Sequence, residues 1–545
     1  MKFSCGKAPF FFFILSLVSL IQNVNAQNDL RTFEKLPLNE SNTVYKKQIA
    51  EGYQIQSAKV EVVDGKTLYS LKYKKPDYKG GVAFWFRMTD ERLAQRQKEM
   101  ESRGRERLFL ESYIENGTTY HLAAWKRPPA IKRPPAIPLG KIWDNIRHIP
   151  ATGKTNRILA PLDELFGSLM LKEQIPGATV CVMHHGEVVY RRGFGYSDLE
   201  AKEKMMPDTL MRIASVSKSI TGVAIMQLAG KRKLNLDQPV FDLLKFDPMD
   251  PTTVDPDLKK ITIRHLLHHT GGFDRQESYD PMFQAKKMVK ALGKELPISH
   301  EDIIRYQMSQ PLDFVPGEKF AYSNYGYCLL GRVIEEVTGD TYEDYVKANV
   351  LKPIGVRNMK IGKALERDRD EDETKYYLRI QTKFPCTVAP DIGKIVKRQY
   401  GVSDVSLMES HGGWIASAND LTRFASAFEN PDRCKLMNAP TIAAMFSPPT
   451  YLKPNITRSG AARYYAGGWY MVVSKKGFAN AFHGGTIQGT SSFLVRRSDG
   501  FSWAILFNCD KATDNETYLD RLVDGPMHVA VNAVAKNSGL KRKSK

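Results

Sequence analysis

A serine and a lysine three positions apart, Ser215 and Lys218, are the strongest candidates for nucleophilic chemistry in this chain. They follow a strand-like segment, 210–214, and open an apolar run, 220–229, whose length and spacing predict a helix. Residues three apart share one face of a helix, so the lysine amine would lie near the serine hydroxyl. A buried lysine loses its charge more readily and could then accept the hydroxyl proton. The alternative is a serine that caps the helix beside a surface lysine.

A second candidate pair, Tyr322 and Asn324, lies just before a predicted apolar helix at 329–337. A tyrosine near two cations could shuttle a proton, and an asparagine amide could hold a substrate carbonyl group. The alternative is a loop tyrosine whose neighbouring asparagine caps the next helix.

A third candidate motif, His483-Gly484-Gly485-Thr486, follows a strand-like segment at 467–473. Residues 491–507 then predict two more strands. The glycines would let a substrate lie along a strand edge, with the Thr486 N–H turned toward it. The alternative is a simple hairpin turn.

In this order the three motifs resemble those of the serine β-lactamase and penicillin-binding-protein superfamily. The most similar branch contains class C enzymes, D-Ala-D-Ala carboxypeptidases and family VIII esterases. Segments 261–272 and 412–424 also resemble that branch, and the resemblance covers roughly residues 160–530. It implies an α+β fold, with an antiparallel sheet built from both ends of the domain, flanking helices and a helical subdomain.

The resemblance also implies a role for each motif residue. Ser215 would be the acylated nucleophile, Lys218 its general base and Tyr322 the relay that carries the proton to the leaving group. Asn324 would orient the acyl side chain. The backbone N–H groups of Ser215 and Thr486 would form the oxyanion hole, where losing one donor typically costs about 3 kcal/mol of barrier. No cofactor is implied.

The third motif departs from the family pattern, because His483 and Gly484 replace the Lys and Thr that bind a substrate carboxylate in drug-hydrolysing members. A neutral imidazole is a weak carboxylate anchor, and glycine has no hydroxyl. We therefore expect an esterase, amidase or peptidase acting on a small molecule or peptide, rather than an efficient β-lactamase. The alternative is a binding or scaffold protein that kept the fold and lost activity, and intact Ser215, Lys218 and Tyr322 argue against it.

Two other patterns invite different chemistry. His265 and His268 lie one helical turn apart, but no glutamate completes a zinc-protease motif, so we expect packing rather than a metal site. Gly153-Lys-Thr155 ends like a phosphate-binding loop, but His148 stands where the first glycine is required.

The N-terminal part of the sequence predicts a signal peptide followed by a small accessory domain. Residues 1–26 combine lysines, an apolar run and a small-residue cleavage site after Ala26, which predicts a signal peptide and a secreted or periplasmic protein. Residues 27–125 predict an αβ accessory domain, because 52–73 and 104–125 align as two β-hairpins with Asx-Gly turns. This repeat resembles the one that precedes the catalytic domain of polyglycine hydrolases. A helix at 89–102 precedes the second copy.

The remaining boundaries follow from composition. Residues 126–142 contain Lys-Arg-Pro-Pro-Ala-Ile twice and predict a semi-rigid linker. Residues 143–535 would form the hydrolase domain and 536–545 a basic, disordered tail. The five cysteines outside the signal peptide are too widely spread for a disulfide framework or zinc site, so we expect them to fill the core.

The chain has 545 residues and a formal net charge of +19. With 42% apolar residues, neither wholesale disorder nor a polytopic membrane protein is expected. The charge fits a nucleic-acid binder, a partner of anionic surfaces or a solubility feature. Predicted export argues against nucleic acid, and the tail holds five of the basic residues. Contact with an anionic surface such as a cell wall stays a hypothesis, and nothing predicts the oligomeric state.

Overall fold

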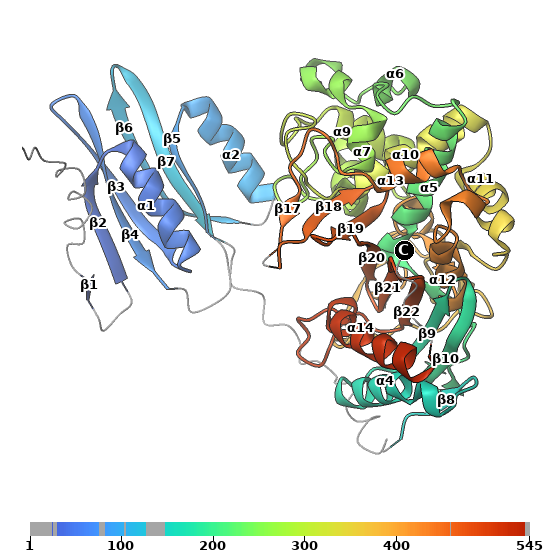
Figure 1. Ribbon diagram of the computed structural model, residues 1–545. Helices are drawn as coiled ribbons and strands as arrows, with labels where there is room; N and C mark the ends of the chain where they lie inside the picture. Colours follow the sequence, from blue (N-terminus) through green and yellow to red (C-terminus); the bar gives the residue numbers. More distant parts are fainter. Residues whose placement is uncertain are drawn as a thin grey trace, which may run out of the picture. The chain divides into compact units, whose positions relative to one another are not determined.

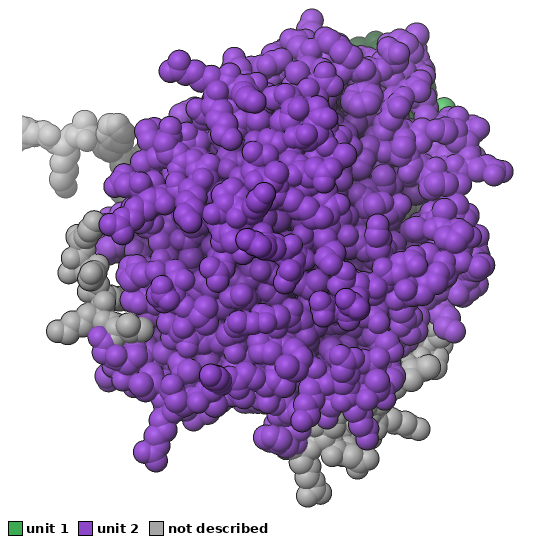
Figure 2. Space-filling view, turned by 90° about the vertical axis from the view of Figure 1, so that its right-hand side faces the viewer, with its two compact units in different colours: residues 1–135 green, residues 136–545 purple. Residues whose placement is uncertain are grey.

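The computed structural model describes residues 24–25, 30–75, 82–102, 105–126, 148–457 and 459–539. Nearly all of the predicted signal peptide, most of the predicted linker and the last six residues of the predicted tail lie outside the described residues. The chain divides into two compact units, residues 1–135 and 136–545, which Figure 2 distinguishes by colour.

The first unit contains two β-α-β-β repeats. Each repeat forms an antiparallel sheet in which the last strand lies in the middle, in the orders β2-β4-β3 and β5-β7-β6, and the short strand β1 extends the first sheet. The elements are β1 (Val24–Asn25), β2 (Leu30–Leu36), α1 (Leu38–Ala50), β3 (Gln54–Val63), β4 (Lys66–Lys74), β5 (Val82–Met88), α2 (Asp90–Ser102), β6 (Glu106–Glu115) and β7 (Thr118–Lys126).

Both predicted hairpins are present, β3–β4 and β6–β7. Their turn residues Asp64, Gly65, Asn116 and Gly117 all have positive φ, as a type I′ turn requires, which explains the Asx-Gly pairs. The two repeats share one hydrophobic cluster. Within it the hydroxyls of Tyr69 and Tyr113, at different positions in the two copies, are hydrogen-bonded at 2.7 Å.

The second unit is built on a long antiparallel sheet (Figure 1) in the order β11-β10-β9-β22-β21-β20-β19-β18-β17, with β8 paired to β10. The fold is therefore α+β and β-lactamase/transpeptidase-like, and strands from both ends of the unit meet where β9 pairs with β22. The strands are β8 (Ala151–Thr152), β9 (Gly177–His184), β10 (Glu187–Asp198), β11 (Glu203–Lys204), β17 (Asn455–Ile456), β18 (Ala462–Ala466), β19 (Trp469–Val473), β20 (Ala479–Ile487), β21 (Thr490–Arg496) and β22 (Phe501–Phe507).

Helices cover both faces of this sheet. On one face α4 (Ala160–Lys172) lies beside α14 (Leu519–Asn537), the red helix of Figure 1, and both pack on alternate side chains of β9 and β22. On the other face α5 (Ser217–Gly230) and α12 (Ala418–Ser426) pack on the intervening side chains. The two hydrophobic cores are thus separated by the sheet.

Further helices form a subdomain that continues the core of α5. They are α6 (Val240–Leu243), α7 (Ile263–Leu267), α8 (Ala285–Leu292), α9 (His300–Met308), α10 (Asn324–Thr338), α11 (Tyr342–Val346) and α13 (Ala439–Phe446). Small sheets join β12 (Met211–Arg212), β16 (Trp414–Ala416) and β13 (Lys360–Ile361), and pair β14 (Lys383–Pro385) with β15 (Ile395–Lys397).

The predicted helices 220–229 and 329–337 lie within α5 and α10. The predicted strand 210–214 is wrong in extent, because only Met211 and Arg212 are in a strand and the chain turns at Ala214. The five cysteines are free, and Cys181, Cys328, Cys386 and Cys509 are buried as expected. None of the helices among the described residues is both long and apolar enough to cross a membrane.

Candidate active site

Ser215 lies on a strained turn between β12 and α5. Ala214, the residue before it, has φ of 45°, a left-handed conformation that costs about 1 kcal/mol or more for a residue other than glycine. Thr490 and Ser492 of β21 donate hydrogen bonds to the carbonyls of Arg212 and Ile213, at 3.0 and 2.6 Å. The sheet therefore fixes the backbone that presents Ser215, whose side chain is only half-buried.

Lys218 is fully buried one turn along α5. Its Nζ lies 3.3 Å from Ser215 Oγ, 2.6 Å from Asn324 Oδ1 and 2.8 Å from the carbonyl of His411. Burial lowers the pKa of the Lys218 amine well below its usual value. A neutral amine has two N–H groups and one lone pair. When the amine is neutral, the two acceptors engage both N–H groups and the lone pair is left for the Ser215 hydroxyl.

Tyr322 also lies close to this amine, with its ring centre 4.8 Å from Lys218 Nζ. Its hydroxyl is buried and has no hydrogen-bond partner in the described part of the chain. Burial raises the pKa of the phenol well above its usual value, and the Ser215 side chain opposes that rise. The ring of His269 packs on Tyr322 at 4.3 Å between centres. Burial lowers the pKa of this imidazole well below its usual value, which favours its neutral form.

Asn324 begins α10, but it is not the helix cap. Ser323 is the cap, since its hydroxyl accepts a hydrogen bond from the Gly326 N–H. The Asn324 amide instead joins Lys218 to the partly buried Asp280: its oxygen accepts from Lys218, and its NH₂ donates to Asp280 at 2.6 Å. Burial raises the pKa of the Asp280 carboxyl, which lies in a segment that the sequence motifs did not include.

His483 is buried and neutral in β20. Its Nδ1 donates to the carbonyl of Gly484 at 2.7 Å, and its Nε2 lies 3.1 Å from the hydroxyl of Tyr465. Burial lowers the pKa of His483 to about 3. Both ring nitrogens are thus engaged within the protein, so this side chain has no free donor for a substrate carboxylate.

Gly484 and Gly485 allow close packing around the nucleophile turn. A Cβ on Gly485 would lie 2.2 Å from the Ile213 carbonyl oxygen and 3.0 Å from the Ser215 nitrogen, and one on Gly484 would lie 2.4 Å from the Asp520 carboxylate. At Gly485 the clash would be with backbone, so only glycine lets β20 lie directly beside the Ser215 N–H, whereas at Gly484 the Asp520 side chain would have to move.

The far end of β20 has one unpaired edge. Pairing with β19 stops at Phe482, whereas pairing with β21 continues to Ile487. Residues 483–487 therefore present an edge toward the Ser215 turn, and the Ser215 N–H makes no hydrogen bond within the described residues. Thr486 lies on this edge, where its N–H and that of Ser215 could receive one carbonyl oxygen.

The structure brings all eight candidate residues into one region, and it adds residues that the motifs did not indicate: Asp280, His411, Thr490 and Ser492. They come from three separate segments and act through single hydrogen bonds, so no local pattern marks them. The paired histidines serve structural contacts instead: His265 completes a capping box with Thr262, and His268 hydrogen-bonds Tyr451.

Comparison with known proteins identifies relatives over the same region. Protein flp of Staphylococcus aureus (strain N315) is 28% identical over 376 residues, which cover 68% of this chain and 66% of that protein. Esterase EstB of Burkholderia gladioli is 35% identical over 206 residues, 37% of this chain and 51% of that protein. An octameric penicillin-binding protein homologue from Pyrococcus abyssi superposes with a TM-score of 0.52 at 25% identity, covering 70% of this chain and 77% of that chain.

A family profile gives the broadest match. The profile described as Beta-lactamase covers residues 162–525, from α4 into α14, and so includes the sheet, the helical subdomain and all three motifs. The chain therefore belongs to the Beta-lactamase family.

Proposed function

We propose that the protein is a serine hydrolase that cleaves a small ester, amide or peptide through an acyl-enzyme on Ser215. The observation that carries this proposal is the environment of Lys218. A fully buried amine whose two N–H groups are already engaged directs its lone pair at a half-buried serine hydroxyl 3.3 Å away. In this arrangement the Lys218 amine can act as the base that accepts the Ser215 hydroxyl proton.

Acylation follows from these contacts. Ser215 Oγ attacks the substrate carbonyl carbon while its proton passes to Lys218 Nζ, and the carbonyl oxygen gains charge beside the N–H groups of Ser215 and Thr486. The bond between the carbonyl carbon and the leaving group then breaks. The proton held by Lys218 returns through Tyr322 to the leaving oxygen or nitrogen, which departs as a neutral alcohol or amine.

Deacylation uses the same groups in reverse. Water attacks the acyl carbon, and its proton passes through Tyr322 to Lys218. The bond to Ser215 Oγ breaks, and the proton returns to the serine. The product is the free carboxylic acid, so one water is consumed in each cycle.

The third motif favours esters and amides over β-lactams. His483 has no free donor, its pKa of about 3 keeps it uncharged, and Gly484 has no hydroxyl. A carboxylate next to the reacting ring would find no anchor at these two positions. The esterase named among the relatives also supports this substrate class.

An active-site probe tests the proposal. The purified protein is treated with a fluorophosphonate, which we expect to label the wild type and the Ser217→Ala variant but not Ser215→Ala. Ser217 is the matched control because it lies in the same turn and its hydroxyl has no partner in the described part of the chain. Absence of labelling in the wild type would overturn the proposal and favour a binding protein that kept the fold.

We also infer that the protein is exported, from the signal-peptide pattern of residues 1–26. Expression of the full chain in a secretion-competent host, followed by N-terminal sequencing of the exported form, tests this. A mature chain that begins at Gln27 is expected, and retention of Met1 would contradict it.

A further inference from the structure

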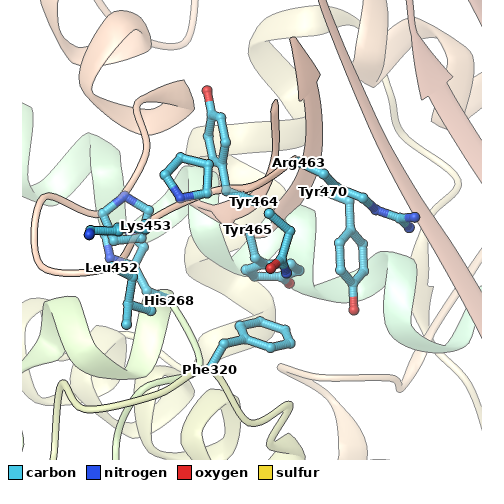
Figure 3. A pocket seen from close by; sticks show the side chains of 11 residues that line it. His268, Phe320, Leu452, Lys453, Arg463, Tyr464, Tyr465 and Tyr470 are labelled. Carbon is cyan, nitrogen blue, oxygen red and sulfur yellow. The ribbon is translucent and has the colours of Figure 1, made fainter. Parts of the chain in front are cut away.

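Figure 3 shows a cavity of about 120 Å³, one of whose lining residues, Tyr465, contacts His483 of the third motif. Its walls come from β18, β19, the segment before β17 and the chain before α10. Most of the lining is aromatic or aliphatic, including Phe320, Leu452, Tyr465 and Tyr470. Such a concave, mostly apolar surface with a few polar groups is typical of a small-molecule site.

The walls of this pocket contact the candidate active site directly. The Tyr465 hydroxyl lies 3.1 Å from His483 Nε2, and the ring of Tyr470 lies 5.4 Å from the His483 ring. Phe320 packs at 5.8 Å on His269, which in turn packs on Tyr322. The pocket is thus linked through its wall residues to His483 of the third motif and, through His269, to Tyr322.

The charged side chains of the pocket are positive. Lys453 and Arg463 line it, and the lining contains no aspartate or glutamate. The Arg463 guanidinium lies 5.7 Å from the ring centre of Tyr470. Neither cation forms an ion pair with any described residue. Arg275 adds a third, exposed cation over the ring of Tyr322, at 4.7 Å. The electrostatic complement of this region is an anion.

We propose that this pocket binds an anionic arm of the substrate, a carboxylate carried on a short aliphatic or aromatic chain, with Arg463 as its principal partner. The inference rests on the proposed hydrolase function and specifies its substrate class. The apolar walls would hold the chain, and the guanidinium would pair with the carboxylate in two parallel hydrogen bonds. The arm could belong to the acyl group or to the leaving group, and the assay separates these two cases.

The experiment compares matched esters. On the acyl side, p-nitrophenyl monoesters of succinate, glutarate and adipate are compared with p-nitrophenyl butyrate. On the leaving-group side, 3-carboxyphenyl butyrate is compared with phenyl butyrate. In one of the two series we expect the wild type to prefer the anionic ester in kcat/KM. Arg463→Gln should reduce that preference about tenfold, mainly through KM, because a charged hydrogen bond contributes about 1.5–3 kcal/mol. Arg423→Gln, an exposed arginine on α12, is the matched control.

The outcomes separate this proposal from the one on which it rests. If the wild type hydrolyses neutral esters but prefers the anionic ester in neither series, the pocket assignment is overturned and the hydrolase proposal stands. The same conclusion follows if Arg463→Gln and Arg423→Gln change the preference equally. If no ester is hydrolysed and no probe labels Ser215, the hydrolase proposal itself has failed.

A separate observation concerns Asp280. Its Oδ2 accepts the hydrogen bond from the Asn324 amide, and its Oδ1 accepts one from the Met282 N–H, which caps the 3₁₀ turn at 281–283. An amide has a donor end and an acceptor end. The carboxylate holds the donor end, so the oxygen of Asn324 must face Lys218.

From this geometry we infer that Asp280 is a positioning residue, which orients Asn324 and through it the lone pair of Lys218. If the amide were reversed, its NH₂ would face the lysine N–H groups, and the lone pair would turn away from Ser215. Asp280 does not touch the reacting atoms, so its effect should fall on the acylation rate and not on substrate binding.

Burst kinetics with p-nitrophenyl butyrate test this role. Asp280→Ala should slow acylation about 100-fold, the typical cost of a misplaced reacting group, with KM within about twofold. Asp280→Asn keeps one accepting oxygen, for either the Asn324 amide or the Met282 N–H, and should recover part of the rate. Asp255→Ala removes a matched aspartate cap from another 3₁₀ turn and controls for lost stability. A wild-type rate in Asp280→Ala, no recovery in Asp280→Asn, or equal losses in Asp280→Ala and Asp255→Ala would overturn the inference.

Discussion

The hydroxyl of Ser492 donates a 2.6 Å hydrogen bond to the carbonyl of Ile213, two residues before the candidate nucleophile. Ser492 is completely buried in β21, nearly 280 residues further along the chain. This bond and the neighbouring one from Thr490 hold the consecutive carbonyls of Arg212 and Ile213. The turn at Ser215 is therefore fixed to the central sheet.

Removing the Ser492 hydroxyl should therefore reduce activity more than stability. Ser492→Ala should lower kcat of ester hydrolysis about 10- to 100-fold, because small misplacements of a reacting group are costly. It should lower the free energy of unfolding by about 1 kcal/mol. Ser502→Ala, at a buried serine of β22 that hydrogen-bonds Glu429, is the control and should lose only stability. Equal kcat in both variants would contradict the prediction.

A methyl group on Gly485 should abolish acylation. Its Cβ would lie 2.2 Å from the Ile213 oxygen, so either β20 or the Ser215 turn must move. We expect Gly485→Ala to lose fluorophosphonate labelling, followed by gel fluorescence. Gly167→Ala in α4 is the control, since its Cβ meets nothing within 4 Å and alanine favours the helix. Normal labelling of Gly485→Ala would show that the strand does not approach the turn this closely.

The lowered pKa of Lys218 has a consequence for stability. Exposed lysine has a pKa of about 10.5, so between the folded value and 10.5 the unfolded chain binds more protons at this site. The free energy of unfolding should therefore rise with pH in that window. Lys218→Met should remove a slope of up to about 1.4 kcal/mol per pH unit at pH values below 10.5. Urea denaturation at several pH values measures this, and identical slopes would show that the amine is charged.

The lowered pKa of His483 should affect stability at acid pH. Its pKa is about 3 when folded, against 6.5 in the unfolded chain. Stability from the neutral imidazole is complete above pH 6.5 and is lost as pH falls toward 3. His483→Gln should flatten the acid limb of the unfolding curve by up to about 1.4 kcal/mol per pH unit. An unchanged limb, measured by denaturant titration from pH 7 to 4.5, would argue against a buried neutral ring.

The paired hydroxyls of Tyr69 and Tyr113 should couple the two N-terminal repeats. Tyr69→Phe, Tyr113→Phe and the double variant form a thermodynamic cycle, from which we expect a coupling energy of about 1 kcal/mol. Thermal or urea unfolding of the full chain measures it. Additive effects of the two substitutions would show that the bond contributes nothing across the repeats.

The sequence predicted the features that depend on local pattern. The helices that carry Lys218 and follow Asn324, and both Asx-Gly hairpins, formed where apolar spacing and turn chemistry placed them. The first strand and helix of each repeat carry a weaker sequence signal. Only the helix at 89–102 was predicted, because α1 and the leading strands lack a shared motif between copies.

Contacts between distant segments could not be predicted. Asp280 stands in an ordinary Tyr-Asp-Pro turn, and only folding brings it to Asn324, 44 residues away. The extent of the strand before Ser215 was also misjudged, because the hydrogen bonds from β21 force Ala214 into a left-handed turn that its side chain alone disfavours.

The pairing of β9 with β22 sets the time at which the candidate site can form. These strands join residues 177–184 to residues 501–507, and β22 also holds the strand that positions Ser215. The nucleophile helix is synthesised about 300 residues before this partner, so the central sheet cannot close during most of translation. A chain that obtains the last strands of this sheet only near the end of synthesis cannot assemble the Ser215 turn before then.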